Sequence, residues 1–135
     1  MSVVTKYPAM LSKIEYLDFS NNPLTGSIPP ITSVNSQLTG LSLKDNCLEG
    51  GIPEDFSMMR ALGSLDLGEN ALDGTIPSTL RLLTNLSSLI LDSNLLTGTI
   101  PVLDQSSLQY VILTINYLTM GSLKEIPFST FSSIA

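Results

Sequence analysis

The sequence predicts a solenoid of about five coils, in which each coil adds one short strand to a parallel β-sheet. Three observations lead to this prediction. Apolar positions recur at an interval of 24 residues, leucine supplies 24 of the 135 residues, and the apolar residues at the start of each repeat alternate with polar ones. A fixed repeat of this length is typical of solenoids, and alternation is typical of a strand with one buried face.

The repeat has the consensus LxLxxNxLxGxIP and occurs four times in succession, beginning at Leu17, Leu41, Leu65 and Leu89. A fifth, partial copy runs from Val111 to Leu118; it starts 22 residues after the fourth copy and keeps only LxLxxNxL. Strands are therefore expected near residues 16–20, 40–44, 64–68, 88–92 and 110–114. Stacked in register, they would lie about 4.8 Å apart.

The remaining motif positions have structural roles that follow from their chemistry. An asparagine follows each strand, where its amide can donate to and accept from the backbone of neighbouring coils. These asparagines form the expected ladder, Asn22, Asn46, Asn70, Asn94 and Asn116. The glycine permits a conformation or close approach that a Cβ atom would obstruct, and the proline ends the next extended segment. Leu80, Leu83 and Leu86 recur at every third position and are expected to point inward from the convex side.

The composition excludes several classes of function. With no histidine and one cysteine, the chain has no Ser-His or Cys-His nucleophile pair, no HExxH zinc motif and no internal disulfide. A formal charge of −6 disfavours nucleic acid as a partner. The sequence contains no apolar run long enough for a signal peptide or a membrane span. We therefore expect a non-enzymatic protein with no cofactor and no metal.

The full pattern, LxxLxLxxNxLxGxIP, resembles the plant-type leucine-rich repeat, which is common in receptor-like kinase ectodomains and receptor-like proteins. The resemblance extends from about Ile14 to Leu118. It implies an α/β-type solenoid: a right-handed superhelix with a concave parallel sheet and a mostly irregular or 3₁₀ convex side. The chain departs from the family's secreted members, which usually carry cysteine pairs at the ends of the solenoid. It also contains no kinase motif.

The resemblance divides the chain into three parts. Residues 1–13 are expected to form part of a preceding coil or a degenerate cap, and residues 14–118 the leucine-rich repeats. Residues 119–135 are expected to form a degenerate or truncated final repeat. Because both ends resemble incomplete coils, we expect the chain to be a fragment of a longer protein.

Candidate binding residues lie on the concave face, which we define as the solvent-facing side chains of the strands. They are Asp18, Lys44, Asp45, Asp66, Glu69, Ile90, Asp92, Tyr110, Ile112 and Thr114. Three interpretations stay open for the acidic members: solvated residues without a ligand, a site for a basic protein or peptide, or a Ca²⁺ site, for which an EF-hand spacing is lacking. A catalytic carboxylate pair is disfavoured because an open sheet gives little burial.

Three other residues carry chemistry of their own. Lys44, among the acids, is expected to be a local charge partner and not an amine nucleophile. Cys47 is expected to be an unreactive thiol. Asn85, in the triplet Asn85-Leu86-Ser87, is a candidate for N-linked glycosylation on the convex side.

The function predicted from the sequence is recognition of a protein or peptide ligand, or of a cell-wall glycan, by part of a receptor-like protein or receptor kinase ectodomain. Two alternatives are a secreted inhibitor of cell-wall-degrading enzymes and an intracellular scaffold. Through its parent protein the chain would be extracellular or associated with the plasma membrane, whereas a complete chain would be cytoplasmic.

Overall fold

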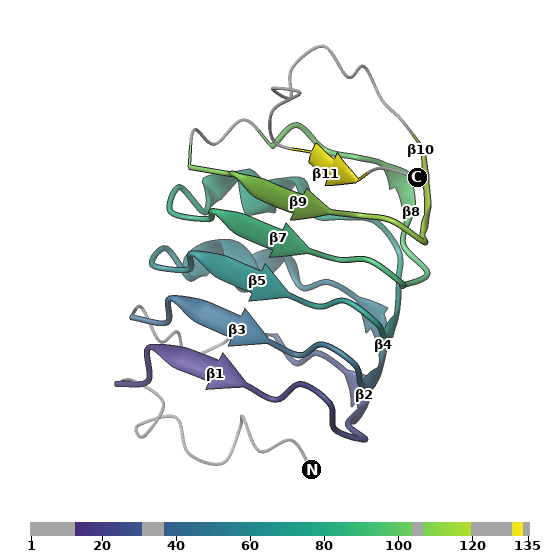
Figure 1. Ribbon diagram of the computed structural model, residues 1–135, viewed down its shortest axis with the longest axis horizontal. Helices are drawn as coiled ribbons and strands as arrows, with labels where there is room; N and C mark the ends of the chain where they lie inside the picture. The colour runs from purple at the N-terminus through teal and green to yellow at the C-terminus, as the bar shows by residue number, and fades with distance from the viewer. Residues whose placement is uncertain (1–12, 31–36, 104–106, 120–130, 134–135) are drawn as a thin grey trace.

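The computed structural model describes residues 13–30, 37–103, 107–119 and 131–133. They form a solenoid whose strands stack one above another (Figure 1). The main sheet is parallel and contains six strands in the order β1-β3-β5-β7-β9-β11. Their bounds are Tyr16–Asp18, Gly40–Ser42, Ser64–Asp66, Ser88–Ile90, Tyr110–Ile112 and Phe131–Ser133.

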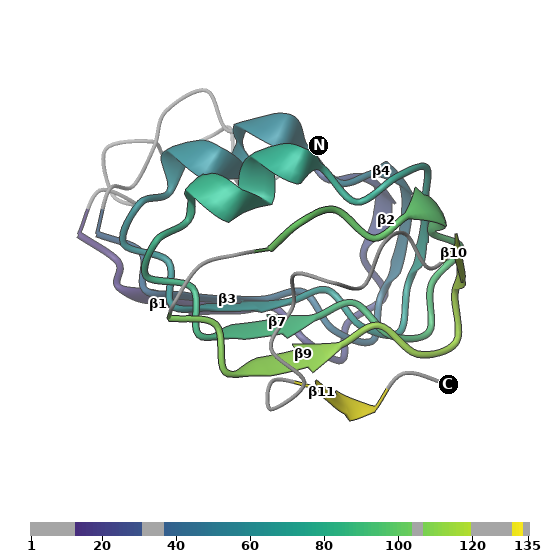
Figure 2. The ribbon, with the colours of Figure 1, turned by 90° about the horizontal axis from the view of Figure 1, so that it is seen from above.

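A second set of strands follows the main sheet around each coil. Its three-stranded sheet contains β2 (Thr25–Ser27), β4 (Cys47–Gly51) and β6 (Ala71–Asp73), and its two-stranded sheet contains β8 (Thr97–Thr99) and β10 (Tyr117–Thr119). All these strands pair in parallel. The 3₁₀ helices η2 (Glu54–Met58) and η3 (Ser78–Leu82) lie on the side opposite the main sheet (Figure 2).

The repeat places the same residue type at the same height in successive coils. Leu41 pairs with Leu65, Leu65 with Leu89, and Leu89 with Val111. The inward side chains of the main sheet, such as Leu65 and Leu89, pack with those of η2 and η3, such as Phe56 and Leu80, in one hydrophobic core. Ten core leucines are fully buried: Leu62, Leu65, Leu67, Leu72, Leu80, Leu83, Leu86, Leu89, Leu91 and Leu96. Burial of each contributes roughly 1.5–3 kcal/mol, so the coil interior is the main source of stability.

The solenoid class and the 3₁₀ convex side agree with the sequence prediction, but the strands are shorter than expected. Each of the five expected strands begins at its predicted residue and ends after three residues. The chain then turns at a non-glycine residue with positive φ. One such residue occurs in each coil: Asn21, Asp45, Glu69, Ser93 and Ile115. The N–H groups of the first four of these turn residues still donate to carbonyls of the next coil, for example Glu69 N to Asp92 O at 2.9 Å.

Two features were not predicted. The second set of strands contains Gly26, Gly50 and Gly98, each with positive φ. Because glycine is depleted in strands, the residue types did not indicate strands at these positions. β11 adds a sixth strand to the sheet expected to have about five, and its register with β9 is irregular. The expectations for residues 1–12 and 120–130 lie outside the described residues. No helix in the described part of the chain is long and apolar enough to cross a membrane.

Candidate functional site

The ladder asparagines fix the turn that follows each strand of the main sheet. The Asn70 side-chain amide donates to the carbonyls of Leu67 and Gly68 in its own coil, at 3.2 and 3.0 Å, and of Leu43 in the preceding coil, at 3.0 Å. Its Oδ1 accepts from Leu48 N at 3.1 Å. Asn46, Asn94 and Asn116 repeat this pattern. The Asn22 side-chain amide, in contrast, donates within its own coil, to the carbonyls of Phe19 and Ser20.

Strand register sets the order of residues across the middle of the concave face. Asp18 pairs with Ser42, Ser42 with Asp66, Asp66 with Ile90, and Ile90 with Ile112. The face therefore changes from polar to apolar along the solenoid, and Asp18 is separated from the other candidate acids of this row by Ser42.

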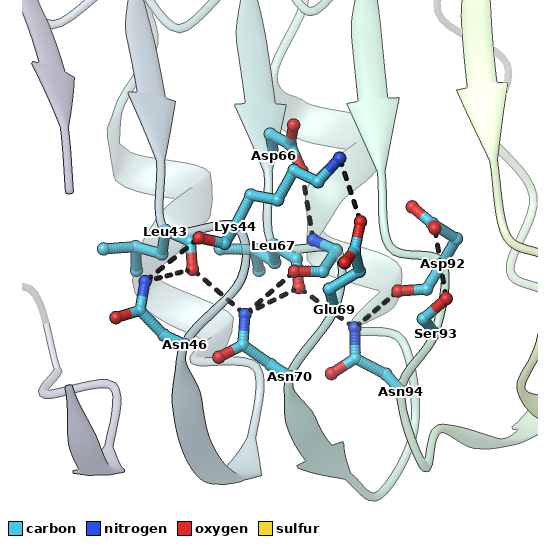
Figure 3. Close-up of polar contacts among 11 residues, drawn as sticks. Leu43, Lys44, Asn46, Asp66, Leu67, Glu69, Asn70, Asp92, Ser93 and Asn94 are labelled. Atoms are coloured by element: carbon cyan, nitrogen blue, oxygen red, sulfur yellow. Dashed lines mark hydrogen bonds and ion pairs between the residues drawn. The ribbon is translucent and has the colours of Figure 1, made fainter. Parts of the chain in front are cut away.

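Four of the predicted residues form a charged cluster, which consists of Lys44, Asp66, Glu69 and Asp92 (Figure 3). Lys44 Nζ lies 3.0 Å from Glu69 Oε1, so this ion pair joins two coils. Asp66 Oδ1 accepts from Gly68 N at 3.0 Å, and Asp92 Oδ2 accepts from the Ser93 hydroxyl at 3.2 Å. The cluster holds three carboxylates and one ammonium group.

Gly68 lies between two of these carboxylates. A Cβ atom at this position would lie 2.7 Å from Asp92 Oδ1 and 3.3 Å from Asp66 Oδ1. The missing side chain therefore allows the carboxylates of adjacent coils to converge above the backbone.

Two members of the charged cluster, Lys44 and Asp66, have raised pKa values. The hydrogen bond and charge of Glu69 raise the pKa of Lys44, with smaller contributions from Asp66 and Asp92. Burial raises the pKa of Asp66, and the charges of Asp92 and Glu69 add to the increase, while the Gly68 N–H and Lys44 oppose it. Lys44 thus acts as a charge partner within the cluster.

The other candidates lie outside the cluster. Asp18 is exposed, and hydrogen bonds from the Ser20 hydroxyl and N–H lower its pKa. Asp45 is an exposed turn residue with φ 53°. At the other end of the face, Ile90, Ile112 and Thr114 are half-buried and Tyr110 is exposed.

Three more exposed aromatic or aliphatic residues lie near this apolar end. Ile115 and Tyr117 are 71% and 67% exposed, and Leu95 is 46% exposed. The repeat pattern predicts Ile115 at an outward position, whereas sequence reasoning missed Tyr117 and Leu95. At the opposite end, Tyr16 is exposed and its ring covers Gly40. All four occupy variable positions of the repeat, and an apolar residue where other coils carry a polar one was the available signal.

Two residues outside the face were also assigned chemistry from the sequence. Cys47 is a free, exposed cysteine on β4. Asn85 is exposed and its side-chain amide donates to Arg60 O at 2.8 Å. Within the described ranges, no group of three or more carboxylate, cysteine or histidine side chains is placed to hold a metal ion.

Comparison with known proteins gives both a family match and structural relatives. The family described as Leucine Rich Repeat matches residues 13–34 and 37–59. A plant ice-binding protein is 34% identical with a TM-score of 0.74, and the match covers 82% of this chain and 37% of that protein. No curated protein matches the sequence.

Two receptor kinases of Arabidopsis are also similar in structure. HAESA, solved with the peptide hormone IDA and the co-receptor SERK1, is 33% identical with a TM-score of 0.75; the match covers 79% of this chain and 18% of HAESA. The leucine-rich-repeat ectodomain of SOBIR1, from Arabidopsis thaliana, is 34% identical with a TM-score of 0.73, with 82% of this chain and 62% of SOBIR1 covered. The chain thus spans less than two thirds of each of these relatives.

Proposed function

We propose that the chain, which matches the leucine-rich repeat family over residues 13–34 and 37–59, is a non-catalytic module that recognises a protein or peptide ligand on its concave face. We further propose that it is part of the ectodomain of a receptor-like protein or receptor kinase. This assignment would place it outside the cell.

The observation that carries the proposal is the contrast between the two faces of the main sheet. The inward positions are uniform, with Leu65 and Leu89 fully buried, whereas the outward positions differ from coil to coil. The exposed Lys44–Glu69 pair contributes only about 0–1 kcal/mol to stability. Packing therefore does not explain the charges and apolar residues of this face, whereas ligand recognition would explain them.

The chemistry of the face indicates a ligand with two kinds of group. The charged cluster favours a basic group, since three carboxylates face one lysine. Tyr110 and Ile112, at the other end, favour an apolar group, and aromatic residues are frequent energetic centres of interfaces. A structural relative, HAESA, has been solved with a peptide hormone and a co-receptor, which supports a peptide or protein ligand.

The proposal can be tested by selecting peptides from a random display library on the purified chain and measuring their Kd. Tyr110→Ala should weaken the selected peptides by about fivefold or more. Asp92→Ala should weaken them by a few-fold, and more at low salt than at high salt because exposed charges are screened.

Arg60→Ala and Arg81→Ala, on the convex side, are the controls and should bind as the parent does. If the convex variants lose binding while Tyr110→Ala and Asp92→Ala keep it, the ligand site is not the concave face. A chain that selects no peptide at all would refute peptide recognition.

The alternatives from the sequence keep the same fold and predict other results. An inhibitor would slow a cell-wall-degrading hydrolase in a direct assay, and a glycan ligand would bind with little dependence on salt. Isolation of the full-length transcript would separate a receptor, with a signal peptide and a membrane span, from a scaffold without either. Attachment of a glycan to Asn85 in a secreting eukaryotic host would support the extracellular assignment.

A further inference from the structure

We infer that Ile115 is an apolar anchor of the ligand site, and that Ile115 and Glu69 together select a peptide in the polyproline II conformation in which a basic residue and an apolar residue lie three positions apart. This inference rests on the proposed function, because it specifies the class of peptide that the concave face would bind.

The first observation is the backbone conformation of Ile115. Its φ is 55°, in the left-handed region. The equivalent turn residues of the earlier coils are Asn21, Asp45, Glu69 and Ser93, all unbranched at Cβ. A β-branched residue is a genuine outlier in this region, whereas asparagine tolerates it. Isoleucine is therefore an unfavourable choice for the turn itself.

The second observation is that Ile115 gains little from packing. Its side chain is 71% exposed, more than any other large apolar residue among those described. The turn uses only its backbone, since Asn94 N donates to Ile115 O at 3.1 Å, and any residue supplies that carbonyl. Backbone strain that no packing interaction offsets is typical of functional positions.

The third observation is the row of turn residues to which Ile115 belongs. Backbone hydrogen bonds join each turn to the next: Asn70 N donates to Ser93 O at 3.1 Å and Asn94 N to Ile115 O at the same distance. Glu69, Ser93 and Ile115 thus follow one another in adjacent coils. Two coil spacings of about 4.8 Å separate Glu69 from Ile115 by about 10 Å.

A peptide in the polyproline II conformation advances about 3.1 Å per residue and completes one turn in three residues. Side chains three positions apart therefore project from the same side of such a peptide and span about the same distance. Such a peptide would run across the coils, with its basic side chain at the charged cluster and its apolar side chain against Ile115. Ser93 lies between Glu69 and Ile115, and its small side chain leaves room for the peptide above it. The carboxylates at one end and the exposed isoleucine at the other match an amphipathic, basic peptide in both charge and polarity.

The test combines stability and binding in one pair of variants. Ile115→Asn removes the strain and the apolar surface together, so its melting temperature should rise by about 3 °C or more while the selected peptides bind at least about fivefold more weakly. Ile115→Val keeps a β-branched apolar side chain, and it should resemble the parent in both measurements. Among the selected peptides, Lys or Arg should be enriched three positions from Leu, Ile or Phe.

The results separate this inference from the proposed function. If Ile115→Asn melts below the parent, Ile115 packs in the fold and is not an anchor. If Ile115→Asn binds peptides as the parent does while Tyr110→Ala and Asp92→Ala weaken them, the anchor is refuted and the proposed function stands. A library that yields no binder refutes both. Selected peptides without the three-residue spacing would overturn the assigned peptide class.

Discussion

Replacement of Asn70 by alanine tests whether the asparagine ladder stabilises the stack of coils. Asn70 lies in the middle of the solenoid, donates to three carbonyls and accepts from Leu48 N. Alanine would leave the Leu48 N–H without its acceptor, and Leu48 is only 6% exposed. A buried donor that loses its partner costs on the order of 1–3 kcal/mol.

The matched control is Asn22→Ala, at the same motif position in the first repeat. Asn22 is exposed, and its side-chain amide donates to the carbonyls of Phe19 and Ser20 in its own coil. Its replacement should cost less than about 1 kcal/mol.

The two variants can be compared by urea denaturation and by thermal melting. One kcal/mol corresponds to about 3–5 °C in a chain of this size, so Asn70→Ala should melt clearly below Asn22→Ala. Equal destabilisation of the two variants would show that the hydrogen bonds between coils do not stabilise the fold.

Two further predictions concern the charged cluster. The pKa of Asp66 is raised in the folded chain, so its contribution to stability is present below the unfolded pKa, near 3.9, and is lost as pH rises through the folded value. Asp66→Asn should therefore melt above the parent at pH 7, with a difference that disappears below about pH 4; a lower melting point at pH 7 would contradict this. Gly68→Ala should push apart the carboxylates of Asp66 and Asp92, because the new Cβ would lie 2.7 Å from Asp92 Oδ1. It should thereby weaken the selected peptides that contain lysine or arginine, and unchanged binding would show that this convergence is not needed.

The sequence predicted the features that recur and missed those that depend on a single coil. The period of 24 residues was sufficient to place the first residue of five strands, because the same buried leucine begins the motif in register. The turn residue was not recognised as a left-handed position, since the five coils place Asn, Asp, Glu, Ser and Ile there and no consensus letter marks it.

The candidate site divides in the same way. Strand alternation indicated that Asp66 and Asp92 face solvent, but not that they converge above Gly68, because that convergence depends on side-chain rotamers in two coils. The repeat also predicted that Ile115 faces outward, because it occupies the same position as Glu69 and Ser93, and its 71% exposure agrees with this. Its left-handed backbone conformation, in contrast, could not be predicted from the sequence.

The stacked register also determines what happens when the number of coils changes. The side chain of a ladder asparagine such as Asn70 contacts the coil before it and its own turn, so one unit can be lost or duplicated without any new kind of contact in the interior. On the concave face the result is different. Loss of the unit that contains Glu69 would bring Lys44 beside Asp92 and Ser93, and it would move Ile115 one coil closer to the lysine. A change in the number of coils would therefore rearrange the charges of the concave face while the remaining coils keep the same packing in the interior.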